Sequence, residues 1–468
     1  MTLALIAAFM VFVDGTIVNL ALAQMGSHLQ ASRSELEWAV NAYTLSFAAV
    51  MLGAGALTDI LGAKRTFVTG LVVFIASSAV CAVARLMLVL NLARLIQGAG
   101  AALLLPSALV LATAAAADEH ARHRLVGRWA AAGGLGMAAG PLLGGALVSA
   151  AGWRSVFAVN VVIGIPALIW SVRSMPSVPR RDRRLDFPGM SAAAFLIGGL
   201  VFALIEGPSQ GRDSPAVLVA IGLALAGGIV FAVVERATRA PLLPLGIYAE
   251  RVFTATAAQG ALFNFAFYGL LFAMSLMLQQ GRGLSAITSG LLFLPLTGLI
   301  SVGTLCAAPL TQRWGRRTVL GVGQAGLGLT FLAVAWASTS ASLWPLTLAL
   351  FPAGLFSGVL VSTMTAQSIA VVEPSLHGAV SSAFNTSRQV GSAIGVAVVG
   401  PLLGTAHNLG HGFVSCLIVS AAATALTLAL TMLARRVPAK VQVPDGDNAC
   451  RPGPAPGPRT GRVFSHCD

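Results

Sequence analysis

The chain has 468 residues, of which 56% are hydrophobic and only 10% are charged, and its mean hydropathy is +0.84. This composition is too apolar for a soluble multi-domain protein, so an integral membrane protein is the first interpretation. The net charge of +13 would also suit a nucleic-acid-binding protein, and the positions of the charges distinguish the two classes.

Apolar segments long enough to cross a bilayer recur from the first residue to about residue 434. Each has about 18 to 25 residues, which is the length that a helix needs to span the hydrocarbon core. We therefore predict an all-α integral membrane protein with fourteen transmembrane helices. Their approximate limits are 1–24, 38–58, 66–84, 87–111, 122–151, 155–172, 188–206, 215–234, 253–278, 287–311, 317–337, 343–372, 378–404 and 410–434.

The basic residues support this topology. When the N-terminus is placed in the cytoplasm, 22 of the 29 lysines and arginines fall in cytoplasmic loops or the tail, and five fall in outer loops. The other two, Arg94 and Arg388, fall within spans. This bias follows the positive-inside rule. It predicts an even number of spans, both termini in the cytoplasm, the lipid bilayer as surroundings and no nucleic-acid partner.

A repeated pattern divides the chain into two parts. Residues 57–64 resemble residues 310–317, and the run Gly-Pro-Leu-Leu-Gly occurs at 140–144 and again at 400–404. The order of the matches is preserved, which indicates two six-helix halves related by duplication, with a substrate site between them near the bilayer midplane. The predicted organisation is an N-terminal half at 1–172, a linker with two inserted helices at 173–252, a C-terminal half at 253–436 and a disordered cytoplasmic tail at 437–468.

Charged residues inside the predicted spans are scarce, and each costs about 2.5 to 3.5 kcal/mol at the bilayer centre on insertion scales. Asp14, the only acidic residue that we place well inside a span, lies at a depth similar to that of Arg94. Burial favours the protonated form of Asp14 and the nearby arginine favours the ionised form, so the pair suits proton coupling. The alternative is a structural ion pair. Arg388 is expected to reach the cytoplasmic surface, as its repeat counterpart Arg128 does.

The fifth span carries a glycine-proline pattern with the spacing G-x8-G-x3-G-P-x2-G-G. Its residues are Gly127, Gly136, Gly140, Pro141, Gly144 and Gly145. Glycines leave a groove in which another helix can pack closely, and a proline removes a backbone donor and kinks the helix. Such a helix can bend or seal at an interface. Ordinary packing of small residues is the alternative, and it accounts poorly for the whole pattern.

Four motifs make the chain resemble the drug:proton antiporter family with fourteen spans, the EmrB/QacA type, of the major facilitator superfamily. They lie at 14–19, at 55–65, at 94–100 and in the glycine-proline pattern of the fifth span. The resemblance implies the major facilitator fold and proton-coupled export of drug-like or antibiotic small molecules across the cytoplasmic membrane by alternating access. It implies the proton motive force as the energy source without a cofactor, and we expect a monomer to suffice.

The resemblance also implies roles for individual residues. Asp14 and Arg94 would couple protons, and a cytoplasmic loop would act as a conformational latch. The latch residues are Asp59, Gly62, Lys64 and Arg65. Candidates for substrate binding, which come from the second, ninth and twelfth spans, are Asn41, Gln259, Phe263, Asn264, Tyr268, Met364 and Gln367. Aromatic and methionine side chains with few polar anchors suit a moderately apolar, neutral or weakly charged ligand.

Two other functions are open to such a sequence. A proton-linked or facilitated carrier of a nutrient or metabolite is the nearest alternative, and the glycine-proline pattern disfavours it. A polytopic membrane enzyme would need a constellation of His, Cys, Asp or Glu at catalytic depth, and no such constellation or metal-ligand spacing occurs in the sequence. We therefore predict a transporter that is not an enzyme and binds no metal.

Overall fold

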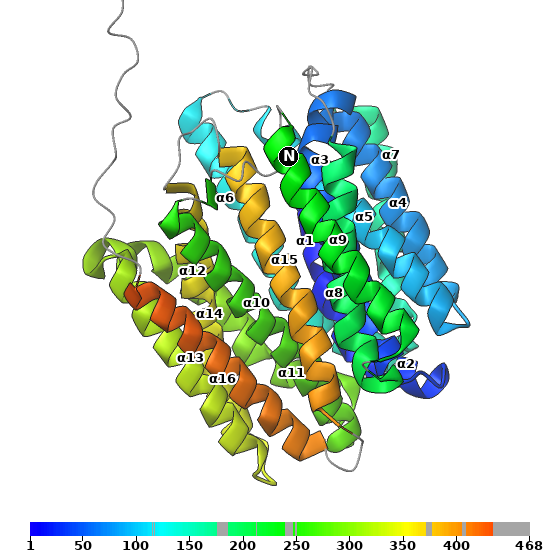
Figure 1. Cartoon of the computed structure of the whole chain (residues 1–468), viewed down its shortest axis with the longest axis vertical. Coiled ribbons are helices and arrows are strands. Elements are labelled where there is room, and N and C mark those ends of the chain that lie inside the picture. The colour runs from blue at the N-terminus through cyan, green and yellow to red at the C-terminus, as the bar shows by residue number, and fades with distance from the viewer. Residues whose placement is uncertain are drawn as a thin grey trace, which may run out of the picture. The chain divides into compact units, whose positions relative to one another are not determined.

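Helices make up nearly all of the described chain in the computed structural model (Figure 1). The structure describes residues 1–114, 116, 118–175, 186–211, 213–238, 247–248, 250–370, 377–404 and 409–433. The helices of the N-terminal half are α1 (Thr2–Ile17), η1 (Val18–Ala21), α2 (Leu22–His28), α3 (Arg33–Leu61), α4 (Ala63–Val83), α5 (Met87–Thr113), α6 (Glu119–Ala151) and α7 (Ser155–Ser174). The next two are α8 (Phe187–Gln210) and α9 (Pro215–Ala237). The C-terminal half contains α10 (Arg251–Leu276), η3 (Met277–Gly281), α11 (Ala286–Leu292), α12 (Leu294–Trp314), α13 (Arg316–Ser338), α14 (Trp344–Ala370), α15 (His377–Leu402) and α16 (Leu409–Leu433).

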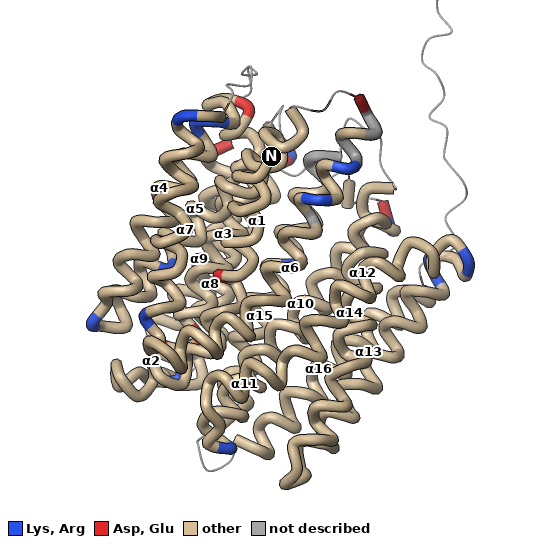
Figure 2. Tube along the Cα trace, turned by 180° about the vertical axis from the view of Figure 1, so that it is seen from behind, with Lys and Arg blue, Asp and Glu red and all other residues tan. Residues whose placement is uncertain are grey.

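Thirteen helical stretches in the described residues are long and apolar enough to cross a membrane. The remaining predicted span corresponds to α15, a helix of 26 residues that carries polar side chains such as Asn385, Arg388 and Ser392. It packs against α10 and α3, so protein rather than lipid surrounds much of its polar face. Figure 2 shows most of the charged residues near helix ends, with long uncharged stretches between them. The prediction of an all-helical membrane protein is confirmed.

The two halves repeat the same helix pairs. In the first half α1 packs on α6, α3 on α5, and α4 on α5 and α7. In the second half the corresponding pairs are α10 with α15, α12 with α14, and α13 with α14 and α16. The inserted helices α8 and α9 pack on each other, and α8 also contacts α3 and α15. The architecture of two related six-helix halves with an inserted pair is thus confirmed.

The repeat extends to the turn after the second helix of each half. Gly62 joins α3 to α4 with φ +87° and ψ +139°, and Gly315 joins α12 to α13 with φ +79° and ψ +148°. Residues with a Cβ rarely adopt this conformation, so each turn requires glycine. The same sequence pattern therefore builds the same backbone at both places.

Replacing Gly62 with alanine should destabilise the protein because the backbone must remain at a positive φ, which costs about 1 to 3 kcal/mol for a residue with a Cβ. The measurement is the thermal unfolding midpoint of the purified protein in detergent. Gly55→Ala is the matched control, since Gly55 lies within α3 and a Cβ there would meet no described atom within 4 Å. Equal midpoints for the two variants would contradict the assignment of strain to the turn.

Residues 1–434 form one compact unit. Its outer faces carry many exposed large apolar side chains, such as Val162, Leu305 and Trp336, as expected for surfaces that contact lipid. The boundaries proposed for the halves and the linker stay predictions. The predicted tail at 437–468 lies outside the described residues.

Candidate functional site: a buried charge pair and a central cleft

Asp14 and Arg94 form an ion pair in the interior of the N-terminal half. Arg94 Nη1 donates to Asp14 Oδ2 at 2.5 Å, and both side chains are buried. Asp14 Oδ1 accepts hydrogen bonds from Gln97 Nε2 at 2.9 Å and from Asn160 Nδ2 at 2.6 Å. The carboxylate on α1 therefore receives donors from α5 and α7. The sequence predicted the pair as plausible partners, and the structure confirms that they meet.

The surroundings of Arg94 complete a closed network. Its Nε donates to the Ala39 carbonyl oxygen at 2.9 Å, and its guanidinium carbon lies 4.3 Å from the centre of the Tyr43 ring. Gln97 links the network to Ser78 through a hydrogen bond of 2.7 Å. Asp14 is 0% exposed, so protein encloses the whole carboxylate in this conformation. Such a network is suited to a charge that changes with conformation.

The glycines of α6 lie against α1, the helix that carries Asp14. A Cβ on Gly136 would approach the Phe9 carbonyl oxygen to 2.6 Å, and a Cβ on Gly144 would approach the Ile17 carbonyl oxygen to 2.8 Å. Between them, a Cβ on Gly140 would collide with the Thr16 hydroxyl. Only glycine permits this approach of the two backbones.

The end of the same pattern faces the other half. A Cβ on Gly145 would lie 2.5 Å from the Ala286 carbonyl oxygen, and one on Gly290 would lie 2.7 Å from the Pro141 carbonyl oxygen, so α6 and α11 are in close contact. Gly127, at the other end of the pattern, has no described atom within 4 Å of a Cβ. Five of the six predicted residues thus lie in one seam that connects α1 with the C-terminal half.

Further contacts between the halves gather at the same end of the bundle, away from the N-terminus (Figure 1). Ser275 Oγ donates to the Asn19 carbonyl oxygen at 2.5 Å, and the Ile287 amide donates to Ser149 Oγ at 3.0 Å. Near the first contact both halves leave regular α-helical geometry, at η1 in the N-terminal half and at η3 in the C-terminal half. Irregular turns within helices are frequent at hinges.

Glu37, on α3, is a buried acidic residue that the sequence analysis did not recognise. Its side chain is 2% exposed and packs against Gly400 of α15. One of its carboxylate oxygens, Oε2, has no hydrogen-bond partner among the described residues. α3 begins at Arg33, before the predicted limit of residue 38, so Glu37 lies near the start of this helix and is already enclosed by α15. That Asp14 is the only acidic residue well inside a span stays a prediction.

The predicted latch residues lie around the turn between α3 and α4. Asp59 is in the last turn of α3, Lys64 and Arg65 are in the first turn of α4, and Gly62 forms the turn. Thr66 supports the turn with a hydrogen bond from its hydroxyl to the Gly62 carbonyl oxygen at 3.2 Å. The role of a latch stays a prediction.

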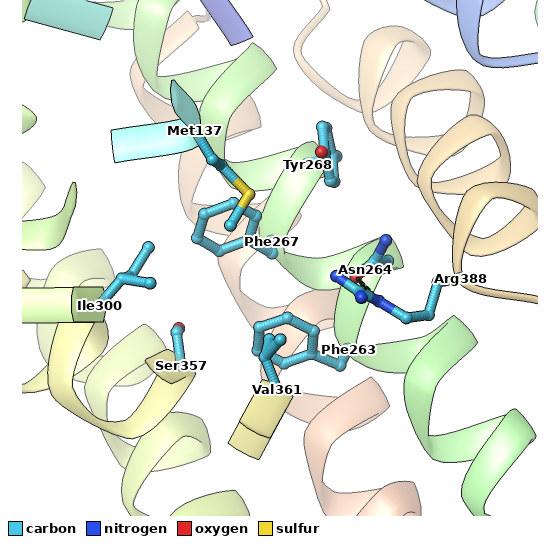
Figure 3. A pocket seen from close by; sticks show the side chains of 9 residues that line it. All are labelled: Met137, Phe263, Asn264, Phe267, Tyr268, Ile300, Ser357, Val361 and Arg388. Carbon is cyan, nitrogen blue, oxygen red and sulfur yellow. Dashed lines mark hydrogen bonds between the residues drawn. The ribbon is translucent and has the colours of Figure 1, made fainter. Parts of the chain in front are cut away.

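A narrow cleft lies between the two halves (Figure 3). Most of its wall comes from α10, α12, α14 and α15, and Met137 of α6 contributes from the N-terminal half. The lining residues are Met137, Phe263, Asn264, Phe267, Tyr268, Ile300, Ser357, Val361 and Arg388. The cleft is therefore lined by residues of both halves, and its role as a substrate site stays a prediction.

The structure brings three of the predicted binding residues into this cleft, namely Phe263, Asn264 and Tyr268. The others do not line it. Gln259 donates to Thr431 at 2.8 Å, and Gln367 donates to Thr256 at 2.9 Å, so both join helices of the C-terminal half. Met364 is buried. Asn41 is also buried, and neither of its amide atoms has a partner among the described residues.

Arg388 is placed differently from the expectation. It does not follow Arg128, whose side chain is exposed, but lines the cleft and donates from Nε to Asn264 Oδ1 at 3.2 Å. The expectation that Arg388 reaches the cytoplasmic surface is wrong, because its side chain is held by α10 and lies beside Phe384, with the guanidinium carbon 5.9 Å from the ring centre.

The fold and these two sites together define a polytopic membrane carrier built from two related halves. Residues 4–396 match the Major Facilitator Superfamily. The chain belongs to this superfamily of transporters and is a multi-pass membrane protein.

The comparison with known proteins gives similar chains of nearly equal length. The methylenomycin A resistance protein of Bacillus subtilis (strain 168) is 36% identical over 428 residues, which are 91% of this chain and 92% of that protein. The cephamycin export protein CmcT of Amycolatopsis lactamdurans is 34% identical over 458 residues, which are 94% and 93% of the two chains. The xylose transporter XylE from Escherichia coli, in a partially occluded inward-open conformation, has a TM-score of 0.64 and 12% identity, and the match covers 93% of this chain and 98% of XylE. The last likeness concerns the fold alone.

Proposed function

We propose that this protein is a proton-coupled antiporter that exports drug-like or antibiotic small molecules across the cytoplasmic membrane by alternating access. The observation that carries the proposal is the buried Asp14–Arg94 pair, a titratable charge enclosed by three helices of one half. The names of the similar proteins, which concern antibiotic resistance and export, support drug-like molecules as the cargo. A monomer, with both termini in the cytoplasm, would carry out the cycle.

The seam along α6 gives this proposal a mechanical basis. Because Gly140 packs against Thr16, two residues after Asp14, a change in the charge of Asp14 that shifts α1 must also shift α6. α6 in turn contacts α11 through Gly145 and contributes Met137 to the cleft. Protonation of Asp14 would thereby bias how the two halves meet around the substrate.

The contacts between the halves support an assignment of this structure to one state of the proposed cycle. With the N-terminus in the cytoplasm, the Asn19–Ser275 and Ser149–Ile287 hydrogen bonds lie toward the outer surface. We infer a state that is closed to the exterior, in which drug would enter the cleft from the cytoplasm or the inner leaflet. Opening to the outside would require both contacts to break.

The proposed function is tested by a resistance and efflux screen in a bacterial host that lacks its own drug pumps. Cells that express the protein should tolerate higher concentrations of at least one antibiotic and should retain less of it. A protonophore should abolish the difference in retention. An empty vector and the Asp14→Asn variant are the controls. Efflux that persists when the proton motive force is collapsed would contradict proton coupling, whereas unchanged resistance across the whole panel would contradict drug export.

A further inference from the structure

Arg388 is a cation inside the carrier that lacks a counter-ion. Its one hydrogen bond to another side chain among the described residues is to the neutral Asn264, and Asn264 in turn donates to Ser392 at 3.1 Å. No carboxylate of the described residues lies within 4.0 Å of Arg388, and no Asp or Glu lines the cleft. Arg94, the other arginine within a predicted span, is neutralised by Asp14.

A charge without a partner inside a membrane protein is costly, and such residues mark binding sites or ion pathways. Asn264 and the Phe384 ring stabilise the guanidinium only partly, because both are neutral. Because the Arg388 side chain lines the cleft, the guanidinium donors that do not bond Asn264 are available to a molecule bound there. A planar group with several fixed donors is suited to a carboxylate, which it can bind with two parallel hydrogen bonds.

A second polar group in the cleft also lacks a partner. Ser357 on α14 is 1% exposed, lines the cleft, and its hydroxyl has no hydrogen-bond partner among the described residues. The rest of the lining is largely apolar. The Phe263 and Phe267 rings stack with their centres 5.8 Å apart, and Met137 approaches from the other half (Figure 3).

We propose that the cleft binds small molecules with one anionic group, such as a carboxylate, on an apolar body, and that Arg388 binds the anionic group. Asn264 holds the guanidinium in position, and Ser357 offers a further donor. The aromatic rings and Met137 contact the apolar body, so the bound molecule touches both halves. That this is a substrate site rests on the proposed export function. The assignment narrows the expected cargo from drug-like molecules in general to drug-like molecules with one negative charge.

The test compares two probes of the same shape that differ in charge. Radiolabelled 1-naphthaleneacetate and 1-naphthaleneacetamide are bound to the purified protein in detergent, and the dissociation constant of each is measured by equilibrium dialysis. The wild-type protein should prefer the anion by about tenfold or more, as expected for a charge-assisted hydrogen bond. Arg388→Gln should lose this preference and bind the two probes with similar affinity, and Arg388→Lys should keep part of the preference.

Two further variants separate recognition from folding. Asn264→Asp keeps Arg388 and nearly the same shape but supplies a carboxylate within the protein, so it should reduce the preference for the anion over the amide by about tenfold or more. Arg128→Gln removes an exposed positive charge from α6 and should bind both probes as the wild type does. Elution profiles and thermal midpoints of all variants are measured alongside.

The outcomes decide the proposal without depending on transport. Wild-type protein that binds neither probe, or binds both equally, overturns it, and so does an Asn264→Asp protein that keeps the full preference for the anion. Proton-driven uptake of the anion into inside-out vesicles is measured separately. Preferred binding of the anion without such uptake would contradict the proposed export function and leave the proposed binding site standing. Export of other drugs by a protein that does not prefer the anion would contradict the binding site and leave the export function standing.

Discussion

Replacing Asp14 with asparagine is expected to abolish export of a drug against its concentration gradient while leaving exchange of the drug down its gradient. Asparagine keeps the shape of the side chain but cannot titrate, so the step that takes up or releases a proton is lost. The measurement is drug accumulation in inside-out vesicles with an imposed pH gradient. Undiminished accumulation by Asp14→Asn would remove Asp14 from the coupling reaction and make Glu37, a further buried carboxylate of the N-terminal half, the next residue to test.

The same change also leaves Arg94 buried without its partner, which costs about 3 to 5 kcal/mol when one member of a buried pair is removed. A loss of transport through unfolding must therefore be separated from a loss of coupling. The matched control combines Asp14→Asn with Arg94→Gln, which removes both charges together. We expect the double variant to recover the thermal midpoint and still to fail in uphill export. Uphill export by the double variant would show that the pair serves folding alone.

Gly140→Leu is expected to abolish export while the protein still inserts into the membrane. Even a Cβ at Gly140 would collide with Thr16, and a full leucine side chain would push α6 away from α1, where overpacking costs about 1 to 3 kcal/mol. That displacement separates the helix of Asp14 from the seam with α11. Export and the amount of protein in the membrane are measured on the same cells.

Gly134→Ala is the matched control on the same helix, because a Cβ there meets no described atom within 4 Å. It should export normally. Gly127→Ala separates the effect of close helix packing from that of the sequence pattern. Gly127 belongs to the glycine-proline pattern, but a Cβ there would face open space. Normal efflux by a well-inserted Gly140→Leu protein would contradict a mechanical role for the seam.

The sequence predicted the features that depend on local composition and on rare residues. The length of an apolar segment identifies a membrane span whatever the position of that helix in the bundle. The repeat around Gly62 and Gly315 is found by comparing two segments of the sequence. The Asp14–Arg94 pair could be predicted because charges within spans are so scarce that few partners exist. Gln97, three residues after Arg94 on the same helix face, could have been added to the pair by its spacing.

Other parts of the site depend on how each helix is rotated, which composition does not reveal. Asn160 is a single amide in an apolar helix, and nothing in its neighbours indicates that it donates to Asp14. The repeat makes Arg388 equivalent to Arg128, and both helices pack on the first helix of their half. The Arg128 side chain is nevertheless exposed, whereas Arg388 donates to Asn264 of α10, so equivalent sequence positions have different surroundings. Glu37 lies one residue before the predicted span 38–58, and its burial depends on contact with α15, which hydropathy does not reveal.

The central claim, that drug and proton move in opposite directions through one protein, is tested most directly by measuring both fluxes in the same proteoliposomes. Purified protein is reconstituted inside out around a pH-sensitive dye, and a compound identified by the efflux screen is added outside. With an acidic lumen the compound should accumulate above its external concentration while the lumen loses protons, and Asp14→Asn should show neither change. Equilibration of the compound at equal concentrations, with no proton flux linked to its entry, would contradict the account.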